Sequence, residues 1–142
     1  MTMASDLILP MVSELLGTMY FMAPVYLGEI AVPADAYKVG VGFTGAVAGE
    51  FHLAVAHHLA DRMAADFLAN EVEEVDPQLV EATVRELANV ACCAAMAAWR
   101  PGDNFHFTVP FVLRDDAELP PAHAFSILSG RPEISFEVRV AD

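Results

Sequence analysis

The stretch from Asp76 to Trp99 constrains the fold more than any other part of the chain, because it predicts a single long helix. Asp76 is a good N-cap, Pro77 suits the first helical position, and Glu81 places an acid near the positive end of the helix dipole. Apolar residues recur at helical spacing and predict a buried stripe, made of Leu79, Val80, Thr83, Leu87, Val90, Ala91, Ala94 and Ala98. We therefore expect a helix from about residue 77 to about residue 99.

Polar residues collect on the other side of this predicted helix, namely Gln78, Glu81, Arg85, Glu86 and Asn89. Residues three apart lie on one helical face, so Glu86 and Asn89 should point outward together. A solvated helix face alone would explain such a pair. The pair becomes a candidate site only through the segments that precede it in the chain.

The chain of 142 residues is expected to form one domain, residues 1–142, with 56% hydrophobic residues to fill its core. Further helices are predicted near residues 6–22 and 57–69, and strands near residues 26–32, 37–44, 47–55, 104–113, 123–129 and 133–140. The last strand alternates apolar and polar residues, which predicts a half-buried sheet: Ile134, Phe136, Val138 and Val140 against Ser135, Glu137 and Arg139. Residues 70–76 and 114–121 are expected to be surface connections.

This order of elements predicts an α+β fold, a two-layer sandwich with a mainly antiparallel sheet of about six strands and long helices on one face. Each long helix precedes three predicted strands, which indicates a pseudo-twofold internal duplication. Ser13-Glu14-Leu15-Leu16-Gly17 is similar to Arg85-Glu86-Leu87-Ala88-Asn89, but the first copy has Gly17 in the place of Asn89.

The chain carries 20 acidic residues against 7 lysines and arginines, a formal charge of −13, and its only lysine is Lys38. Nucleic acid and anionic membrane surfaces are poor partners, because binding to both depends on clustered positive charge. The longest apolar run, residues 88–99, is broken by Asn89 and falls far short of the ~20 residues of a membrane span. Residues 1–24 contain Asp6 and Glu14 and lack the pattern of a secretory signal, so a cytoplasmic protein is expected.

Cys92 and Cys93 are adjacent on the predicted helix, so their side chains diverge by about 100° and should not bond to each other. We interpret them as small buried or partly buried side chains. A cysteine phosphatase needs a Cys-x-x-x-x-x-Arg loop at a helix N-terminus, whereas Arg100 lies seven residues after Cys93 and both cysteines come late in a helix. Spacing and position both exclude that mechanism.

No histidine falls in a pattern with metal-ligand spacing, among His52, His57, His58, His106 and His123. His52 and His106 lie in predicted strands and could meet across a sheet, but a structural or surface role is the default interpretation. The chain also lacks the Gly-x-x-x-x-Gly-Lys phosphate loop, the Gly-x-Ser-x-Gly elbow and the Gly-x-Gly-x-x-Gly strand turn. No self-sufficient catalytic motif is present, and we expect no metal or cofactor bound by this chain.

Three segments occur in an order that resembles a known family. Residues 42–53 form two strand-like halves around a glycine-bearing turn, an alanine-rich helical segment follows over residues 59–68, and the helix with Glu86 and Asn89 comes next. This order resembles the CheX-type chemotaxis phosphatases of the CheC/CheX/FliY class, in which a Phe-Ser-Gly-x-x-x-Gly turn leads to an alanine-rich helix and then to a Glu-Leu-x-Asn helix. The resemblance covers residues 37–99 well and the flanks in architecture only.

Two positions depart from the family pattern. Thr44 replaces a serine, which is a mild change, and Cys93 stands where the family usually has a glycine. A cysteine is small, so the helix should survive, but the approach of a partner would be altered. Some members of the class carry two Glu-x-x-Asn helices, whereas CheX-type members keep only the second. Gly17 places this chain with the one-site group.

The resemblance implies a protein-aspartyl-phosphate phosphatase that acts on a phosphorylated CheY-like response regulator. The regulator would supply the phosphoryl group, Mg²⁺ and most of the active site, while Asn89 would orient the attacking water and Glu86 would pair with the regulator's active-site lysine. The resemblance also implies a homodimer. Two alternatives stay open: a non-enzymatic signalling or flagellar-switch adaptor that binds a receiver domain, and an unrelated ligand-binding domain.

Overall fold

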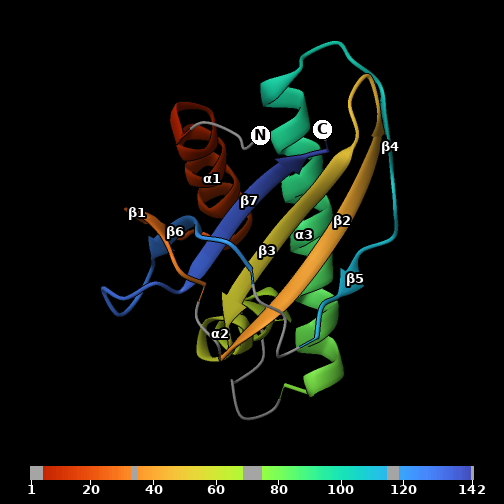
Figure 1. The fold of residues 1–142 in the computed structure, drawn as a ribbon. Coiled ribbons are helices and arrows are strands. Elements are labelled where there is room, and N and C mark those ends of the chain that lie inside the picture. Colours follow the sequence, from red (N-terminus) through yellow and green to blue (C-terminus); the bar gives the residue numbers. More distant parts are fainter. Residues whose placement is uncertain (1–4, 33–34, 69–74, 115–118, 142) are drawn as a thin grey trace.

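The computed structural model describes residues 5–32, 35–68, 75–114 and 119–141. These residues form one sheet with helices packed on one of its faces (Figure 1). The elements, in chain order, are α1 (Ser5–Tyr20), β1 (Val25–Ile30), β2 (Ala36–Gly45), β3 (Gly49–Ala56), α2 (His57–Leu68), α3 (Pro77–Trp99), β4 (Phe105–Phe107), β5 (Phe111–Val112), β6 (Ala122–Ser126) and β7 (Ile134–Val140). The predicted α+β class and the two layers are confirmed.

The sheet is antiparallel, with the strand order β1-β6-β7-β3-β2-β4, and β5 also pairs with β2. It has seven strands rather than about six, because the strand expected over residues 104–113 is divided into β4 and β5. Residues 108–110 separate the two. Pro110 has no N–H group to donate, so it cannot continue a ladder of hydrogen bonds.

The strand order supports the predicted pseudo-twofold duplication. The first half, α1 to β3, and the second half, α3 to β7, each consist of a helix followed by strands. The last strands of the halves, β3 and β7, pair in the centre of the sheet. The first strand of each half pairs with a middle strand of the other, β1 with β6 and β4 with β2. The halves are therefore interleaved within one sheet.

The core lies between the sheet and the helices. Its largest fully buried side chains include Phe43, Phe51, Phe125 and Phe136 from the strands and Leu16 from α1. Phe136 contacts Phe51 and Phe125 through tilted and edge-on ring pairs, with centroids 6.3 and 5.9 Å apart. These rings join the two central strands β3 and β7 to β6.

Helix α3 is buried over a different band from the predicted stripe. Leu79 and Ala98 are exposed, so that part of the prediction was wrong. The reason is that α3 packs against β2 and β3 and also against α1 and α2, which widens the buried surface and shifts it round the helix. The buried residues of α3 are Val80, Val84, Leu87, Ala88, Ala91, Cys92, Ala95 and Met96.

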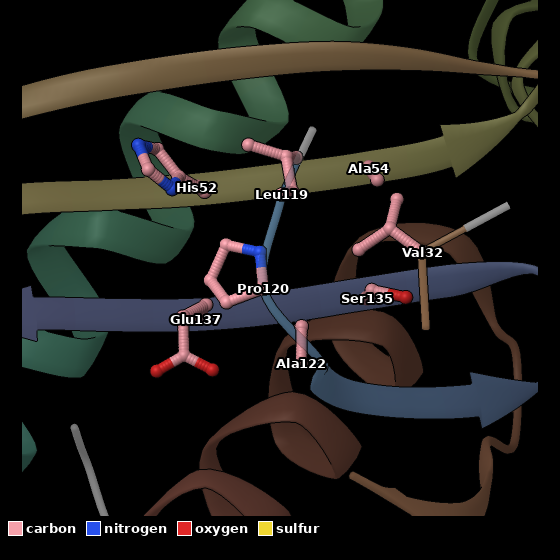
Figure 2. Close-up of a pocket in the computed structure, with 8 residues that line it drawn as sticks. All are labelled: Val32, His52, Ala54, Leu119, Pro120, Ala122, Ser135 and Glu137. Atoms are coloured by element: carbon pink, nitrogen blue, oxygen red, sulfur yellow. The ribbon is translucent and has the colours of Figure 1, made fainter. Parts of the chain in front are cut away.

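Part of the sheet face opposite the helices is covered by other segments of the chain. Ser135 and Glu137 of β7 lie on this face and were expected to be solvent-exposed, but both are buried. Figure 2 shows that Val32, Leu119 and Pro120 lie over this part of the sheet. The expectation for Ser135 and Glu137 was therefore wrong, because two other segments of the chain cover them, one after β1 and one before β6.

The two expected surface connections are only partly described, since residues 70–74 and 115–118 lie outside the described residues. Within the described ranges, the helices lack the combination of length and apolar character that crossing a membrane requires.

Candidate functional site

Helix α3 presents Glu86 and Asn89 together on its outer side, as predicted. Asp76 caps the helix, with its Oδ1 accepting a hydrogen bond from the Gln78 N–H at 2.7 Å. Leu87, next to Glu86, is buried in the core and sets the rotation of the helix. Glu86 is exposed and Asn89 is half-buried. Neither side chain has a hydrogen bond or ion pair with another described residue, so both remain available to a partner.

Glu86 and Asn89 border an open groove of about 440 Å³. One wall is the outer face of α3, and the other wall is the segment that runs from the end of β4 towards β5. The lining residues are Ala82, Arg85, Glu86 and Asn89 on α3 and Phe107, Thr108, Val109 and Pro110 on the segment. The sequence predicted the first wall only.

The charge of Glu86 is not neutralised by its neighbour Arg85. Arg85 Nη2 lies 3.0 Å from Glu81 Oε1, one turn earlier on α3, and Arg85 Nη1 donates to the Pro110 carbonyl oxygen at 3.2 Å. Burial raises the pKa of Tyr20 to about 12, with a further increase from the negative charge of Glu86. Tyr20 therefore stays protonated at neutral pH, and Glu86 presents a negative charge at the groove.

Arg85 was placed by the sequence on the polar side of the helix only. In the structure its guanidinium is half-buried and joins α3 to the opposite wall through Pro110. Sequence reasoning missed this link, since the two residues are 25 positions apart.

The glycines of β2 let the second wall approach the sheet closely. A Cβ atom at Gly42 would lie 2.9 Å from Thr108 Cγ2, and one at Gly40 would lie 2.5 Å from Phe111 Cε2. The Thr108 N–H donates to the Gly42 carbonyl oxygen at 2.9 Å, and the Gly42 N–H donates to Thr108 Oγ1 at 2.8 Å. Gly40 and Gly42 are two residues apart and so lie on the same sheet face. Two glycines at this spacing are a sequence signal for the close packing of another segment on the strand.

The two cysteines lie in different environments, and the prediction that both are buried or partly buried holds for Cys92 but was wrong for Cys93. Cys92 is buried and Cys93 is exposed, in line with the divergence expected of adjacent helical residues. Burial, followed by the effect of Cys93, raises the pKa of the Cys92 thiol to about 12, and burial also raises the pKa of Cys93. Neither thiol forms a thiolate readily at neutral pH. Cys93 lies one turn beyond Asn89 on α3, so any partner that covers Asn89 also meets Cys93.

The histidines are not brought together. His52 lies on β3 and His106 on β4, and β2 runs between these strands, with His52 opposite Gly40 and His106 opposite Thr44. Thr44, the position where the family pattern has serine, is exposed. Across the described ranges no group of three or more histidine, cysteine, aspartate or glutamate side chains could hold a metal ion.

Three other histidines have carboxylate or hydroxyl partners. His58 Nε2 lies 2.8 Å from Glu133 Oε2, and His123 Nδ1 lies 3.0 Å from the Tyr26 hydroxyl oxygen. His57 contacts Asp35. These contacts connect separate elements of the fold, so they favour the structural interpretation of the histidines.

A second polar pocket lies on the opposite sheet face, between the strands β3 and β7 and the residues Val32, Leu119 and Pro120 that cover them (Figure 2). Three of its buried polar atoms have no hydrogen-bond partner among the described residues: His52 Nδ1, Ser135 Oγ and Glu137 Oε1. Burial raises the pKa of Glu137 to about 7, against a smaller lowering by Arg139. The three side chains point in different directions, and the volume of about 10 Å³ suffices for roughly one water molecule. This pocket therefore does not compete with the groove as a functional site.

Comparison with protein families identifies a model that matches residues 37–124, described as chemotaxis phosphatase CheX. The match begins in β2, includes α3 with both Glu86 and Asn89, and ends in β6. No curated protein matches the chain in sequence.

Solved structures with the same fold come from the same class. The CheX protein of Vibrio vulnificus has a TM-score of 0.73 at 17% identity, with 96% of this chain and 95% of that chain covered. CheX in a CheX–CheY–BeF₃–Mg²⁺ complex from Borrelia burgdorferi has a TM-score of 0.72 at 17% identity, with 96% and 97% covered. FliY of Thermotoga maritima is more distant, with a TM-score of 0.58 at 15% identity and 100% and 93% covered.

The fold and a family match over more than half of the chain agree with each other. The chain belongs to the CheX family of chemotaxis phosphatases.

Proposed function

We propose that this protein accelerates hydrolysis of the aspartyl phosphate of a CheY-like response regulator. The observation that carries the proposal is the open groove, at which a free carboxylate and a free carboxamide lie one helical turn apart. A CheX structure similar to this chain was solved as a complex with CheY, BeF₃ and Mg²⁺, which supports a receiver domain as the partner.

In the proposed reaction, water attacks the phosphorus atom in line with the bond to the aspartate oxygen. That bond breaks, and the products are inorganic phosphate and the free carboxylate of the regulator. Asn89 accepts a hydrogen bond from the water through Oδ1 and donates one to a phosphoryl oxygen through Nδ2, so it orients the water without changing its own protonation. Mg²⁺ held by the receiver domain would neutralise charge on the phosphoryl group.

Glu86 is assigned the anchoring role. Its carboxylate would pair with the active-site lysine of the regulator and so place Asn89 over the phosphoryl group. The pairing is favoured because the neighbouring cation Arg85 does not compete for Glu86: Arg85 is held by Glu81 and Pro110. On docking, water is displaced from the groove, and the strength of this ion pair rises as the local dielectric constant falls.

The alternative function is a signalling or flagellar-switch adaptor that binds a receiver domain without turnover. One observation favours it: Cys93 is exposed on the side of α3 that carries Asn89, where the family pattern has a glycine. A bulkier residue there could hold the partner too far from Asn89 for it to orient water.

The deciding experiment measures phosphate release from receiver domains of the same genome, phosphorylated with a small-molecule phosphodonor, with and without this protein. The proposed function predicts faster release that saturates with receiver concentration. Binding to the phosphorylated receiver without faster release would establish the adaptor instead. Sedimentation of the protein in the same buffer tests the proposed homodimer.

A further inference from the structure

The groove beside α3 has a second wall that the helix motif does not account for. It consists of residues 107–110, from the last residue of β4 to the start of β5, and contributes Phe107, Thr108, Val109 and Pro110 to the lining. We call these four residues the apolar wall. They lie on the side of the groove opposite Glu86 and Asn89, so a partner that reaches both of those side chains must pass along the wall.

The apolar wall is fixed in place from two directions. Two hydrogen bonds between Thr108 and Gly42 hold it to β2, at 2.9 and 2.8 Å. Arg85 Nη1 holds it to α3 through the Pro110 carbonyl oxygen at 3.2 Å. These contacts leave the groove pre-formed, because the wall cannot move towards α3 or away from it without breaking a hydrogen bond. A pre-formed surface loses little conformational entropy when a partner docks.

The wall exposes apolar side chains at the groove. Val109 is 79% exposed and Phe107 is 37% exposed, although both neighbour the two free polar side chains of the site. Single exposed apolar residues are ordinary on protein surfaces, but two in one groove beside a proposed active site form a small apolar patch. Interfaces commonly combine such a patch with a few charged or polar contacts that fix the orientation.

We propose that the apolar wall is a second docking element, on which the receiver domain packs an apolar surface next to its phosphorylation site while Glu86 and Asn89 enter that site. The proposal rests on the function proposed above. Its occupant is the receiver domain, because the wall and the two polar side chains belong to one groove and a single partner must cover both. Val109 is the main apolar contact, since its side chain has the most surface to bury.

The test compares Val109→Ser with Leu128→Ser. Leu128 is 58% exposed in the loop between β6 and β7 and does not line the groove, so it controls for the loss of an exposed apolar side chain. Burying a valine side chain corresponds to about tenfold in affinity. Val109→Ser should raise the half-saturating receiver concentration about five- to tenfold and leave the maximal rate of phosphate release within twofold. Leu128→Ser should match the wild-type protein.

The outcomes separate this inference from the proposed function. If the wild-type protein accelerates phosphate release and Val109→Ser behaves like Leu128→Ser, the second docking element is wrong and the function stands. If the wild-type protein binds the receiver but does not accelerate phosphate release, the same comparison is made with the dissociation constants of the variants for a beryllofluoride-loaded receiver. If it neither binds nor accelerates release, the proposed function is wrong and the inference fails with it. Thermal unfolding of each variant confirms that the fold is kept.

Discussion

The two halves of the molecule share a plan but differ at the exposed positions of their helices. In α1, Leu15 and Leu16 are buried beside an exposed Glu14, and in α3, Leu87 and Ala88 are buried beside an exposed Glu86. Three residues after the glutamate, α1 has Gly17 and α3 has Asn89. The buried positions are alike in both helices, because each must cover the same sheet, whereas the exposed position is free to differ.

The hairpins of the two halves differ as well. The first half joins β2 to β3 through a short turn at residues 46–48. The second half joins β6 to β7 through a longer loop, which the Glu133 carboxylate organises by accepting N–H bonds from Ile127, Leu128 and Ser129 at 2.7, 2.7 and 3.0 Å. The second half therefore carries both the candidate site and the buried, hydrogen-bonded Glu133 carboxylate. Six substitutions test how far this asymmetry extends.

The largest effect is expected for Asn89→Ala. Loss of the water-orienting carboxamide should lower the maximal rate of receiver dephosphorylation by about 100-fold or more. The fold should be kept, because Asn89 is half-exposed and makes no side-chain hydrogen bond within the described structure. Gln78→Ala, another exposed polar truncation on α3 outside the groove, is the control. An unchanged rate for Asn89→Ala at matched thermal stability would remove Asn89 from the site.

Glu133→Ala should have the largest effect on stability. Burial alone would raise the pKa of Glu133, but the N–H groups of Ser129, Ile127 and Leu128, together with His58, lower it to about 2. Removing the carboxylate leaves those donors unpaired and should cost about 2 kcal/mol in the free energy of unfolding at neutral pH. Because the folded-state pKa is depressed, this advantage of the wild type is complete above about pH 4.5 and is lost as the pH falls towards about 2.

Glu137→Gln tests a second buried carboxyl group, whose pKa is shifted in the opposite direction from that of Glu133. The pKa of Glu137 is raised to about 7, mainly by burial, so the wild-type protein loses stability as the pH rises from about 4.5 through 7. The glutamine variant should therefore become the more stable protein over that range. Chemical denaturation at pH 3, 5 and 8 measures both variants. Parallel pH profiles for the two would contradict the opposite environments assigned to these carboxylates.

Glu86→Ala should have an intermediate effect on activity. Loss of the anchor should raise the half-saturating receiver concentration about tenfold and also lower the maximal rate, since Asn89 is then less well placed. Saturation kinetics separate the two quantities. A lower maximal rate with unchanged affinity would show that Glu86 does not act as an anchor.

The smallest effects are expected in α1. Glu14→Ala makes the same chemical change as Glu86→Ala at the equivalent position of α1. It should leave turnover unaltered, because Gly17 has no side-chain carboxamide to orient water. A large loss of turnover would mean that both helices act, and that the halves are functionally alike.

Gly17→Asn should stabilise the helix by a few tenths of a kcal/mol, since glycine is a poor helix former and a Cβ atom here meets nothing closer than 3.9 Å. In an Asn89→Ala background, Gly17→Asn tests whether the first half can regain weak activity.

The sequence predicted the elements that local patterns control. The bounds of α3 agree with the expected residues 77–99, because Asp76 and Pro77 form a local capping signal. The division of residues 104–113 into β4 and β5 was missed, since their hydrogen bonds go to β2, some 60 residues away in the chain. The outward position of Glu86 and Asn89 followed from helical spacing. The exposure of Leu79 did not, because the periodicity of α3 carries no information on the elements that pack around it.

By itself, the sequence determined that α3 is a capped helix with Glu86 and Asn89 on one face, and that its pattern resembles one family. Both follow from interactions between residues a few positions apart, which periodicity and capping record. Only the tertiary structure decided that the pair borders a groove, that Arg85 donates a hydrogen bond to the opposite wall of this groove and that Glu137 is buried. Each of these depends on contacts between segments far apart in the chain, and a single sequence carries no direct record of such contacts.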